Sequence, residues 1–402
     1  MIAYREALRL TLEAIRTLGK EEVPLLSAVG RIAAGDLAGR VDTPSVDVSL
    51  KDGYAVHSQD IQAACESKPV RLRLVGSVAA GGSWGGRIAD GEAVRILSGA
   101  PVPQDADAVI AEEFTQLSGD MLLVTNDAHP GRNILPKGSD ARQGELLVKM
   151  GDRISPTTVG LLAAAGFQAI PVARSPRVAI LATGDEVVAP GEDLLPGRLY
   201  ASNLFTLGAW CRQYGFAVDT FVARDDEDMI REKLRICLGD HDAVLTSGGA
   251  WSGERDLVVH LLNELGWKQV YHRVRIGPGK AVAFGLYQGK PVFCLPGGPP
   301  SNHMAFLQLA LPGLLVAAGM RGAEAGLPVR AMRLAETVRG QVDWTQFIHG
   351  RLEAASDIPL FHPLNSPSRL QMMSAAEAIV RIPEGVAQID QGTVVSGQIL
   401  RF

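Results

Sequence analysis

The chain contains 402 residues, of which 47% are hydrophobic and 21% are charged. This length exceeds one ordinary hydrophobic core, and the composition is typical of a soluble folded protein, so two to four domains are expected. The formal net charge of −5 argues against a general nucleic-acid binder, which needs a basic surface. The longest apolar-leaning run, Met304 to Met320, is too short and too interrupted to span a membrane.

The first residues and the cysteines both indicate a cytoplasmic protein. Charged residues are spread through residues 1–18, so no signal peptide is predicted. The four cysteines are scattered and form no CxxC motif. We therefore expect reduced, mostly buried thiols in the cytoplasm.

The N-terminal part combines a helical region with a β region. Apolar residues at helical spacing predict a helix over 4–18 that Gly19 ends, followed by a shorter element over 22–37. From 44 to 135, short strand-like runs alternate with glycine-rich breakers, as in an all-β module with long loops. The strand-like runs of this module include residues 70–75, 93–96, 108–110 and 121–125.

Beyond Asp140 the pattern turns helical again. Ser155 is a suitable N-cap, Pro156 suits the first helical position, and Gly166 suits the C-terminal end. We expect this helix to pack on the first one, so that residues 1–43 and 136–175 form one helical domain. The β module, 44–135, would then be an insertion.

From Arg177 the chain alternates strands and helices, which predicts a three-layer α/β domain over 176–325. The strands are apolar without alternation, as in a parallel sheet covered on both faces. We expect strands at 178–182, 216–222, 243–245 and 292–295, and helices at 202–214 (capped by Ser202 or Asn203), 228–237, 257–265 and 301–315. Residues 326–402 are strand-like and turn-rich and predict a small, barrel-like C-terminal β domain.

Polar residues and glycines follow four successive strands of this α/β domain. Because the carboxyl ends of parallel strands lie at one edge, these residues should converge. Singly, each aspartate is more simply a helix cap or a solvated loop residue, but together they suit Mg²⁺, which takes oxygen ligands and shares them with phosphates. The residues are Gly184, Asp185 and Glu186, then Asp225 and Asp226, then Gly248, Gly249 and Asp256, then Gly297 and Gly298.

A basic stretch accompanies these carboxylates. The stretch contains Arg273, Arg275 and Lys280. Its Gly-Pro-Gly turn, residues 277–279, would hold Arg275 and Lys280 near the carboxylates. Arginine suits bidentate binding of an oxyanion, and lysine supplies a point charge. A solvated charged strand is the simpler alternative. The predicted site has one half for a metal ion and one half for an anion.

Eight motifs together resemble the molybdopterin molybdenumtransferases, the family that includes the catalytic domain of gephyrin. They are DVSLKDGYAV at 47–56, RILSGAPVP at 95–103, DADAVIAEE at 105–113, ATGDEV at 182–187, SN at 202–203, TSGGAWSGERD at 246–256, GPGKAVAFG at 277–285 and LPGGPPS at 295–301. The resemblance covers essentially the whole chain.

This resemblance implies a four-domain homodimer whose active cleft lies between the molybdopterin-binding α/β domain of one subunit and the β module of the other. The implied reaction inserts molybdenum from molybdate into adenylylated molybdopterin with Mg²⁺ and releases AMP. A partnership with the molybdopterin adenylyltransferase is also implied.

The resemblance also assigns residue roles. Asp52, Glu186 and Asp256 would be catalytic, and Glu186, Asp225 and Asp256 would hold Mg²⁺. The implied substrate-binding residues are Ser98, Asp140, Thr183, Gly184, Asp185, Ser202, Asn203, Asp225, Ser247, Gly248, Gly249, Arg273, Arg275, Lys280, Pro296, Gly297, Pro299, Ser301 and Ser368.

The chain departs from the family pattern at several positions. Gly277 stands where the family usually has lysine, and Arg275 is the expected replacement for that charge. Gly298 replaces an asparagine, and His349 replaces an arginine. These departures leave two alternatives open, a non-catalytic carrier or scaffold for the pterin cofactor and a paralogue that handles tungstate. A third, the adenylyltransferase step, would not need the β module or the C-terminal domain.

Overall fold

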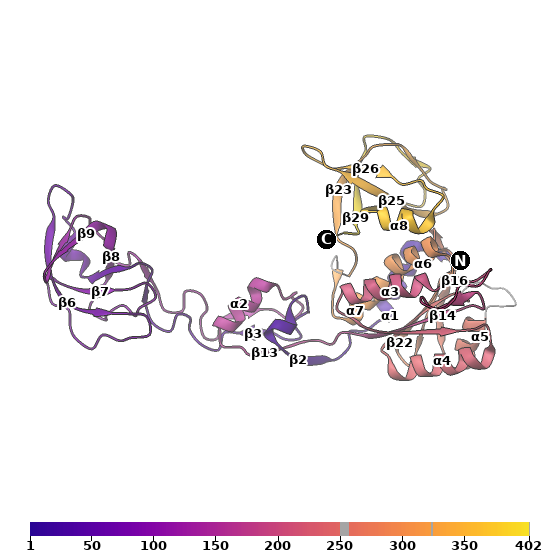
Figure 1. Ribbon diagram of the computed structural model, residues 1–402, viewed down its shortest axis with the longest axis horizontal. Helices are drawn as coiled ribbons and strands as arrows, with labels where there is room; N and C mark the ends of the chain where they lie inside the picture. The colour runs from indigo at the N-terminus through magenta and orange to yellow at the C-terminus, as the bar shows by residue number, and fades with distance from the viewer. Residues whose placement is uncertain (250–256, 323–324, 402) are drawn as a thin grey trace. The chain divides into compact units, whose positions relative to one another are not determined.

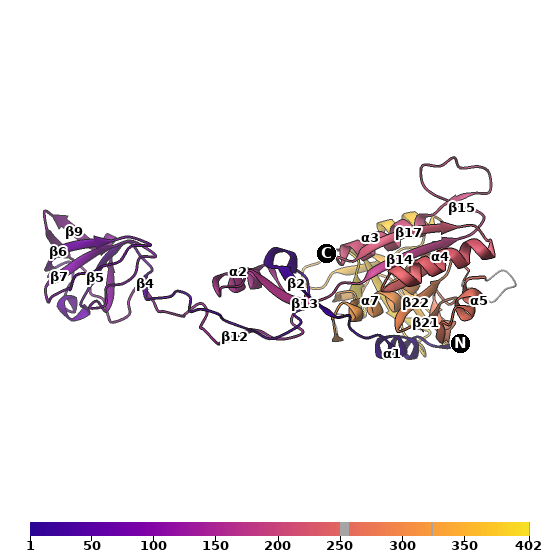
Figure 2. The same cartoon turned by 90° about the horizontal axis from the view of Figure 1, so that it is seen from below.

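The computed structural model describes residues 1–249, 257–322 and 325–401. The chain divides into two compact units, one formed by residues 1–21 and 173–402 and the other by residues 22–172. Figures 1 and 2 show the elements of both units.

The first unit contains a six-stranded sheet in the order β17-β14-β18-β22-β21-β19. The first four strands run parallel, and β21 and β19 continue the sheet antiparallel. The four strands expected from the sequence are therefore present, within two residues of their expected bounds. The strands are β14 (Arg177–Thr183), β17 (Ala217–Ala223), β18 (Ala243–Ser247), β19 (Lys268–His272), β21 (Ala283–Tyr287) and β22 (Lys290–Leu295).

Helices cover both faces of this sheet. α4 (Glu227–Asp240) and α5 (Leu257–Glu264) lie on one face, and α3 (Ser202–Gln213) lies on the other with the last helices of the domain (Figure 1). Burial follows from the sequence pattern, because strand residues such as Leu181 and Val244 pack with helix residues such as Leu234 in one apolar core. The result is a three-layer α/β arrangement.

The last helical stretch of the α/β domain is continuous but irregular. It comprises α6 (Pro299–Ala305), a π-helical turn over Phe306–Ala310 and α7 (Leu311–Ala317). The sequence predicted one regular helix here. Pro312, which has no N–H to donate, is the second residue after the π-helical turn.

The N-terminal helix α1 (Tyr4–Ala14) packs against this stretch. A Cβ atom built at Gly313 would lie 2.6 Å from Ile15 Cδ1 and 3.1 Å from Thr11 Cγ2. The expected packing of this helix on the second helical region is therefore wrong. The helix also ends at Ala14 rather than at Gly19, because the Leu18 N–H bonds the Ala317 carbonyl (2.9 Å) instead of continuing the helix.

The C-terminal part of the first unit is a closed β-barrel, as the barrel-like prediction required. Its strands pair in the order β25-β26-β23-β29-β27, and β27 pairs again with β25. β20 (Val274–Gly277) and β1 (Ile2–Ala3) join the edge of this sheet. The barrel strands are β23 (Val329–Leu334), β25 (Thr345–Glu353), β26 (Leu360–Pro363), β27 (Ala378–Ile382) and β29 (Val394–Ile399), with β24 (Val338–Arg339), β28 (Gln388–Ile389) and helix α8 (Arg369–Ala375) beside them.

The second unit contains the predicted β module. Its six-stranded sheet has the order β8-β5-β7-β6-β10-β9, and it includes all four strands expected there. The strands are β5 (Gly53–Val56), β6 (Val70–Val78), β7 (Glu92–Ile96), β8 (Ala108–Ala111), β9 (Thr115–Ser118) and β10 (Met121–Val124).

The rest of the second unit is less helical than expected. α2 (Pro156–Ala164) is capped by Ser155, whose hydroxyl accepts the Thr158 N–H (3.0 Å), and Gly166 follows with φ +90° as predicted. Short strands elsewhere in this unit form two-stranded sheets. These pair β2 (Lys20–Pro24) with β13 (Ala169–Ala173), β3 (Leu37–Ala38) with β12 (Leu146–Val148), and β4 (Val48–Ser49) with β11 (Ile134–Leu135).

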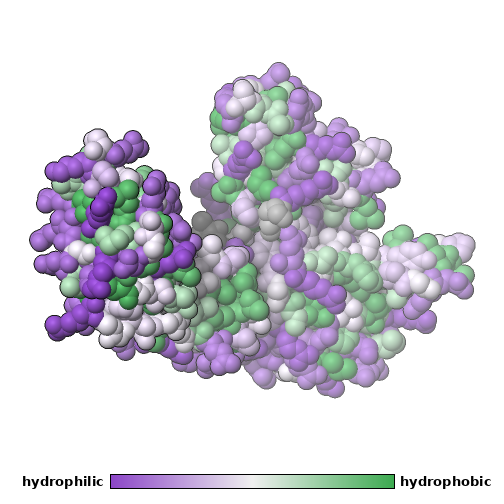
Figure 3. All heavy atoms as spheres, turned by 60° about the vertical axis from the view of Figure 1, so that its left-hand side comes forward, coloured by the Kyte–Doolittle hydropathy of each residue, from purple (hydrophilic) through white to green (hydrophobic). Residues whose placement is uncertain are grey.

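The molecular surface mixes polar and apolar residues. Figure 3 shows hydrophilic side chains over much of one face, with hydrophobic side chains in separate patches between them. Among the described residues, no helix combines the length and the apolar character that crossing a bilayer requires.

Candidate functional site

The parallel strands of the α/β sheet end side by side. Thr183 of β14 is level with Ala223 of β17, Ala182 is level with Ser247 of β18, and Ser247 is level with Leu295 of β22. The residues that follow each strand are therefore neighbours in space. This edge carries most of the residues that the sequence singled out in the α/β domain.

A buried polar network joins the ends of β18 and β22. The Ser247 hydroxyl accepts hydrogen bonds from Asn203 Nδ2 (3.0 Å) and from Asn302 Nδ2 (3.1 Å). The same two amides donate to the carbonyls of Gly297 (2.8 Å) and Pro296 (2.8 Å). The buried Pro296 carbonyl needs a donor, and the two asparagines together fix the Pro296–Gly297 segment against Ser247.

Asn203 was predicted at the site, but its structural role differs from the predicted cap. The N-cap of α3 is Ala201, and no side chain caps this helix, so the expectation of Ser202 or Asn203 as cap is wrong. The Asn203 amide is used across the sheet edge instead. Asn302 was missed by the sequence reasoning, since no turn or strand-end signal marks it.

The glycine turn after β18 is required by packing. Gly248 has φ +100°, and a Cβ atom there would lie 2.7 Å from the Thr183 carbonyl oxygen. Gly249 has φ +62°, and its Cβ atom would lie 2.7 Å from Val258 Cγ2. The Gly248 N–H donates to the Leu295 carbonyl (3.2 Å), which ties the turn to the end of β22.

The predicted carboxylates lie on the turns after β14 and β17. The Glu186 carboxylate folds against Gly184, where a Cβ atom would be 2.8 Å from Oε2. Asp185 Oδ1 accepts the backbone N–H of Asp225 (3.3 Å), which ties the two turns together. The predicted metal ligand Asp256 lies outside the described residues.

The donor chemistry at these turns fits Mg²⁺, because Glu186 and Asp225 offer only carboxylate oxygens. Within the described ranges, the only three His, Cys or carboxylate groups close enough together to share one ion are His57, Asp60 and Asp90 of the β module. His57 Nδ1 lies 3.3 Å from Asp90 Oδ1, a contact that sequence spacing did not reveal. That set is separate from the predicted metal ligands.

A cavity of about 640 Å³ opens at the strand ends, and we call it the strand-end cavity. It also receives apolar side chains from the segment between β15 (Val187–Val188) and β16 (Leu199–Tyr200), and the start of α8 from the barrel. The predicted residues that line it are Thr183, Glu186, Ser202, Asn203, Ser247, Gly248, Gly297, Pro299 and Ser368, and the lining residues not predicted include Leu194, Leu199, Tyr200, Arg369 and Leu370.

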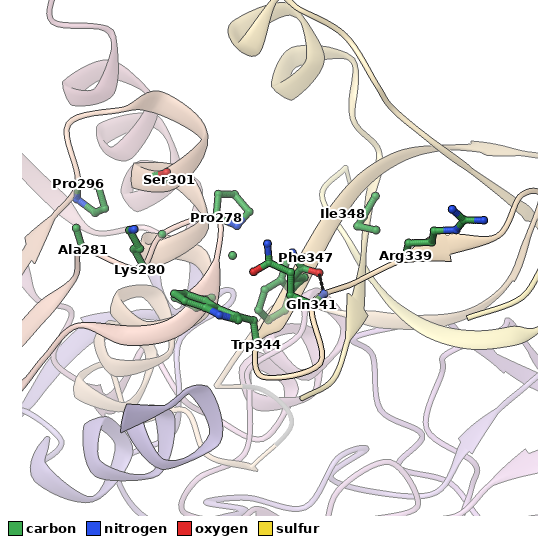
Figure 4. Close-up of a pocket in the computed structure, with 14 residues that line it drawn as sticks. Pro278, Lys280, Ala281, Pro296, Ser301, Arg339, Gln341, Trp344, Phe347 and Ile348 are labelled. Carbon is green, nitrogen blue, oxygen red and sulfur yellow. Dashed lines mark hydrogen bonds between the residues drawn. The ribbon is translucent and has the colours of Figure 1, made fainter. Parts of the chain in front are cut away.

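A second cavity, of about 560 Å³, lies beside the Gly277–Lys280 turn, and we call it the Lys280 cavity. Lys280, Pro296 and Ser301, all predicted, form one wall, and the barrel segment 339–348 forms the other. Figure 4 shows the Trp344 indole extending toward Lys280, while the Arg339 side chain is directed away from it. The barrel wall was not predicted, because it meets the turn only through tertiary pairing.

The two other predicted cations lie elsewhere. Arg275 donates from Nε (3.1 Å) and Nη2 (2.8 Å) to Glu384 Oε1, and neither Arg275 nor Arg273 lines the Lys280 cavity. Arg275 therefore does not replace the family lysine at Gly277. Its side chain instead forms an ion pair with the β27–β28 connection of the barrel.

The two cavities flank one short segment. Pro296 and Ser301 line the Lys280 cavity, whereas Gly297 and Pro299 line the strand-end cavity. The segment begins at the end of β22 and opens α6, and the Asn302 amide holds its first carbonyl. The Pro296–Ser301 segment therefore contributes lining residues to both cavities.

The predicted residues of the β module form a local pair. Asp52 Oδ1 accepts the backbone N–H of Ser98 (2.7 Å), which joins the loop that carries Asp52 to the loop that carries Ser98. Asp140 is held through its own N–H, which donates to the Thr43 carbonyl (2.9 Å). The Asp52 side chain is exposed at the surface of the second unit.

The histidine that replaces a family arginine is buried. His349 of β25 stacks on His303 of α6 with ring centroids 5.8 Å apart and planes 11° apart. The Trp210 Nε1–H donates to His303 Nε2 (2.9 Å). Burial lowers the pKa of His303 to about 3, with a smaller contribution from His349, and burial lowers the pKa of His349 to about 4. Both rings are neutral near pH 7.

Comparison with known proteins places this geometry in context. Residues 2–166 match the family described as MoeA N-terminal region (domain I and II), and residues 179–315 match the family described as probable molybdopterin binding domain. A curated relative from Mycobacterium tuberculosis, named molybdopterin molybdenumtransferase 2, is 30% identical over 98% of both chains.

Two further relatives agree. A molybdopterin molybdenumtransferase from Haemophilus influenzae is 31% identical, covering 75% of this chain and 76% of its own. The crystal structure of a molybdopterin biosynthesis MoeA protein from Pyrococcus horikoshii superposes with a TM-score of 0.84 at 34% identity, over all of both chains.

Proposed function

The chain belongs to the molybdopterin molybdenumtransferase family, and from this membership we propose that it inserts molybdenum from molybdate into adenylylated molybdopterin and releases AMP. The reaction is a step of molybdenum cofactor biosynthesis. The observation that carries the proposal is the pair of cavities on either side of the Pro296–Ser301 segment.

The strand-end cavity suits a planar heterocycle that carries phosphate. Leu194, Leu199 and Tyr200 offer apolar surface for the ring system, and Arg369 and the Ser247 hydroxyl offer donors for phosphate oxygens. Asn203 and Asn302 hold Ser247 and the Pro296–Gly297 carbonyls in place, so the donors are positioned before the ligand binds.

The Lys280 cavity suits the oxyanion. An ammonium group beside polar donors attracts a dianion such as molybdate and holds it next to the segment that borders the pterin cavity. Holding both reactants on one short segment removes much of the entropy cost of bringing them together.

Glu186, Asp225 and Asp256 would hold Mg²⁺, as their carboxylate chemistry suits. When bound, the ion would neutralise charge on the phosphate of the departing AMP. Asp185 supports this arrangement, because its carboxylate accepts the Asp225 N–H and so positions the turn that carries Asp225.

The β module completes the site in this proposal. Asp52 and Ser98 would come from a second copy of the chain, so the working enzyme would be a homodimer. The hydrogen bond from the Ser98 N–H to Asp52 fixes the carboxylate in the loop where the second copy would present it. Asp140 would contribute from the same copy.

The proposal is tested by incubating the purified chain with adenylylated molybdopterin, molybdate and Mg²⁺, and then measuring AMP release and pterin-bound molybdenum. We expect AMP release that depends on molybdate and is lost in Asp256→Ala and Asp52→Ala. Glu192→Ala, an exposed carboxylate that lines neither cavity, is the control. Tight pterin binding without AMP release in the wild-type chain would instead identify a carrier.

A tungstate competition belongs in the same assay, because tungstate and molybdate share charge and tetrahedral shape. Faster AMP release with tungstate than with molybdate would assign the chain to the tungstate alternative. We expect AMP release with molybdate to be at least as fast as AMP release with tungstate.

A further inference from the structure

Gly277 lies beside Gln346 where the α/β domain meets the barrel. The two residues are level in the parallel pair of β20 and β25. A Cβ atom built at Gly277 would lie 3.4 Å from Gln346 Cγ and 3.6 Å from Gln346 Nε2. The Gln346 side chain therefore lies along the space that a side chain at position 277 would enter.

The orientation of the Gln346 amide is fixed by its oxygen. Gln346 Oε1 accepts the backbone N–H of Gln341 (2.7 Å), so the oxygen faces the 340–341 turn. The NH₂ group must then point the other way, toward the Gly277 turn. Within the described ranges this NH₂ group donates to no protein acceptor, and Gln346 lines the Lys280 cavity.

Two of the described residues that line the cavity are cationic, Lys280 and Arg339. Lys280 and Ser301 stand on one wall, and Figure 4 shows Trp344 extending toward Lys280 from the other. Arg275, the nearest alternative in the sequence, is paired with Glu384, and Arg339 is directed away. Gln346 therefore supplies the neutral donor on the barrel wall of the cavity that Lys280 also lines.

We propose that the Gln346 NH₂ group is a binding ligand for the tetrahedral oxyanion in the Lys280 cavity, and that it supplies a fixed neutral donor at the position where Gly277 offers no side chain. The inference rests on the proposed function for the identity of the anion, molybdate or tungstate. It adds a specificity-determining residue from the C-terminal barrel. Because one charge and one dipole hold the anion, a second charge at position 346 strengthens binding.

The test measures equilibrium binding of sodium molybdate to the full chain by titration calorimetry, without any pterin. Gln346→Met keeps the length of the side chain and removes the donor, and we expect about tenfold weaker binding, since hydrogen bonds to charged groups are worth that much. Gln346→Glu places a negative charge at the anion and should abolish binding. Gln346→Lys should tighten binding by about tenfold, because a charge replaces a dipole.

Gln388→Met is the matched control, because Gln388 is an exposed glutamine on β28 of the barrel and lines neither cavity. We expect it to bind molybdate as the wild-type chain does. Urea unfolding of each variant identifies any loss of fold. Lys280→Met tests where molybdate binds. If molybdate binds in the Lys280 cavity, this variant must also bind it more weakly.

Unchanged affinity in a folded Gln346→Met variant would overturn the inference, as would a wild-type chain that binds no molybdate. Failure of the proposed function would give a different result. In that case, molybdate binding would respond to position 346 while AMP release from adenylylated molybdopterin would be absent.

Discussion

Single residues at the edge of the α/β sheet have two kinds of role: some determine the backbone conformation, and others carry charge. Gly248 belongs to the first kind, because its φ of +100° and the nearby Thr183 carbonyl leave no room for a side chain. Glu186 belongs to the second kind, since its carboxylate folds over Gly184 into the strand-end cavity. The two kinds respond differently to substitution.

Gly248→Ala should lower the free energy of unfolding by about 2 kcal/mol, because a Cβ atom in the left-handed region is strained and would also meet the Thr183 oxygen. AMP release should fall with it, since the strand ends would move apart. Urea unfolding measures the first effect. Gly298→Ala is the control, because its φ is −69° and no atom lies within 4 Å of the added Cβ. Equal stability of the two variants would contradict the packing role of Gly248.

Glu186→Gln should leave the fold intact and raise the Mg²⁺ concentration that gives half-maximal AMP release by about tenfold, because a neutral amide binds a divalent cation more weakly than a carboxylate. A Mg²⁺ titration after treatment with a chelator measures this shift. Glu192→Gln, on the exposed segment between β15 and β16, should titrate as the wild type does. An unchanged Mg²⁺ dependence in Glu186→Gln would remove this residue from the metal site.

Pairs of elements meet through side chains that local sequence does not connect. α6 and β25 meet at the stacked rings of His303 and His349, and α3 reaches the same place through Trp210. Both rings are nearly inaccessible, at 4% exposure each. Protonation of either ring would bury a charge beside the other, so the contact between these elements depends on neutral imidazoles.

The histidine pair makes stability depend on pH. The folded pKa values, about 3 and about 4, lie below the ordinary value of 6.5, so between pH 6.5 and 4 the unfolded chain binds protons that the folded chain excludes. Stability should therefore fall as the pH drops through this window, by about 2 kcal/mol per ring from pH 6.5 to 5.

His349→Phe should reduce that loss, because one of the two rings can no longer bind a proton. Urea unfolding at pH 7 and at pH 5 gives the difference for each chain. His260→Ala is the control, since the His260 side chain is 66% exposed on α5. If His349→Phe loses as much stability as the wild type between these pH values, the buried pair is not the source of the pH dependence.

Elements whose burial follows from the local pattern of apolar residues were predictable from the sequence. β14 and β18 are apolar without alternation, and they occupy the centre of the sheet as that pattern requires. The end of α1 was not predictable, because Ile15 and Leu18 continue the helical spacing while the Leu18 N–H is taken by Ala317. The end of α1 therefore depends on the Ala317 carbonyl, which is distant in the sequence.

The residues of the candidate site also divide into those that the sequence could predict and those that it could not. The strand-end residues were predictable, since parallel strands carry their carboxyl ends to one edge. The roles of Asn203 and Asn302 were not, because the carbonyls they satisfy become neighbours only after β18 and β22 pair. Gln346 and Trp344 were missed for a similar reason, since nothing in the local sequence connects β25 with the Gly277 turn.

For the whole molecule, the proposal distributes one site over two copies of the chain. Asp52 belongs to the unit formed by residues 22–172, and Glu186 belongs to the unit formed by residues 1–21 and 173–402. A site that takes one residue from each copy can be rebuilt from two chains that are each inactive.

Co-expression of Asp52→Ala and Glu186→Ala chains should therefore restore AMP release to about a quarter of the wild-type rate, because random pairing gives half mixed dimers with one intact site of two. Different affinity tags isolate the mixed dimers, which should show about half the wild-type rate. Each variant alone sets the baseline. Activity that stays at that baseline in isolated mixed dimers would mean that one copy supplies both residues.

β20 has a consequence for any attempt to simplify the protein. Its residues 276 and 277 add a parallel strand to the barrel, while β19 and β21, the strands before and after it, belong to the α/β sheet. A chain cut after Ala325 would leave that strand as an unpaired edge, open to pairing with other molecules. The loop that carries Lys280 would lose its contact with the barrel at the same time. The isolated α/β portion would therefore aggregate and would lack an ordered anion-binding cavity, so it would not be a minimal enzyme.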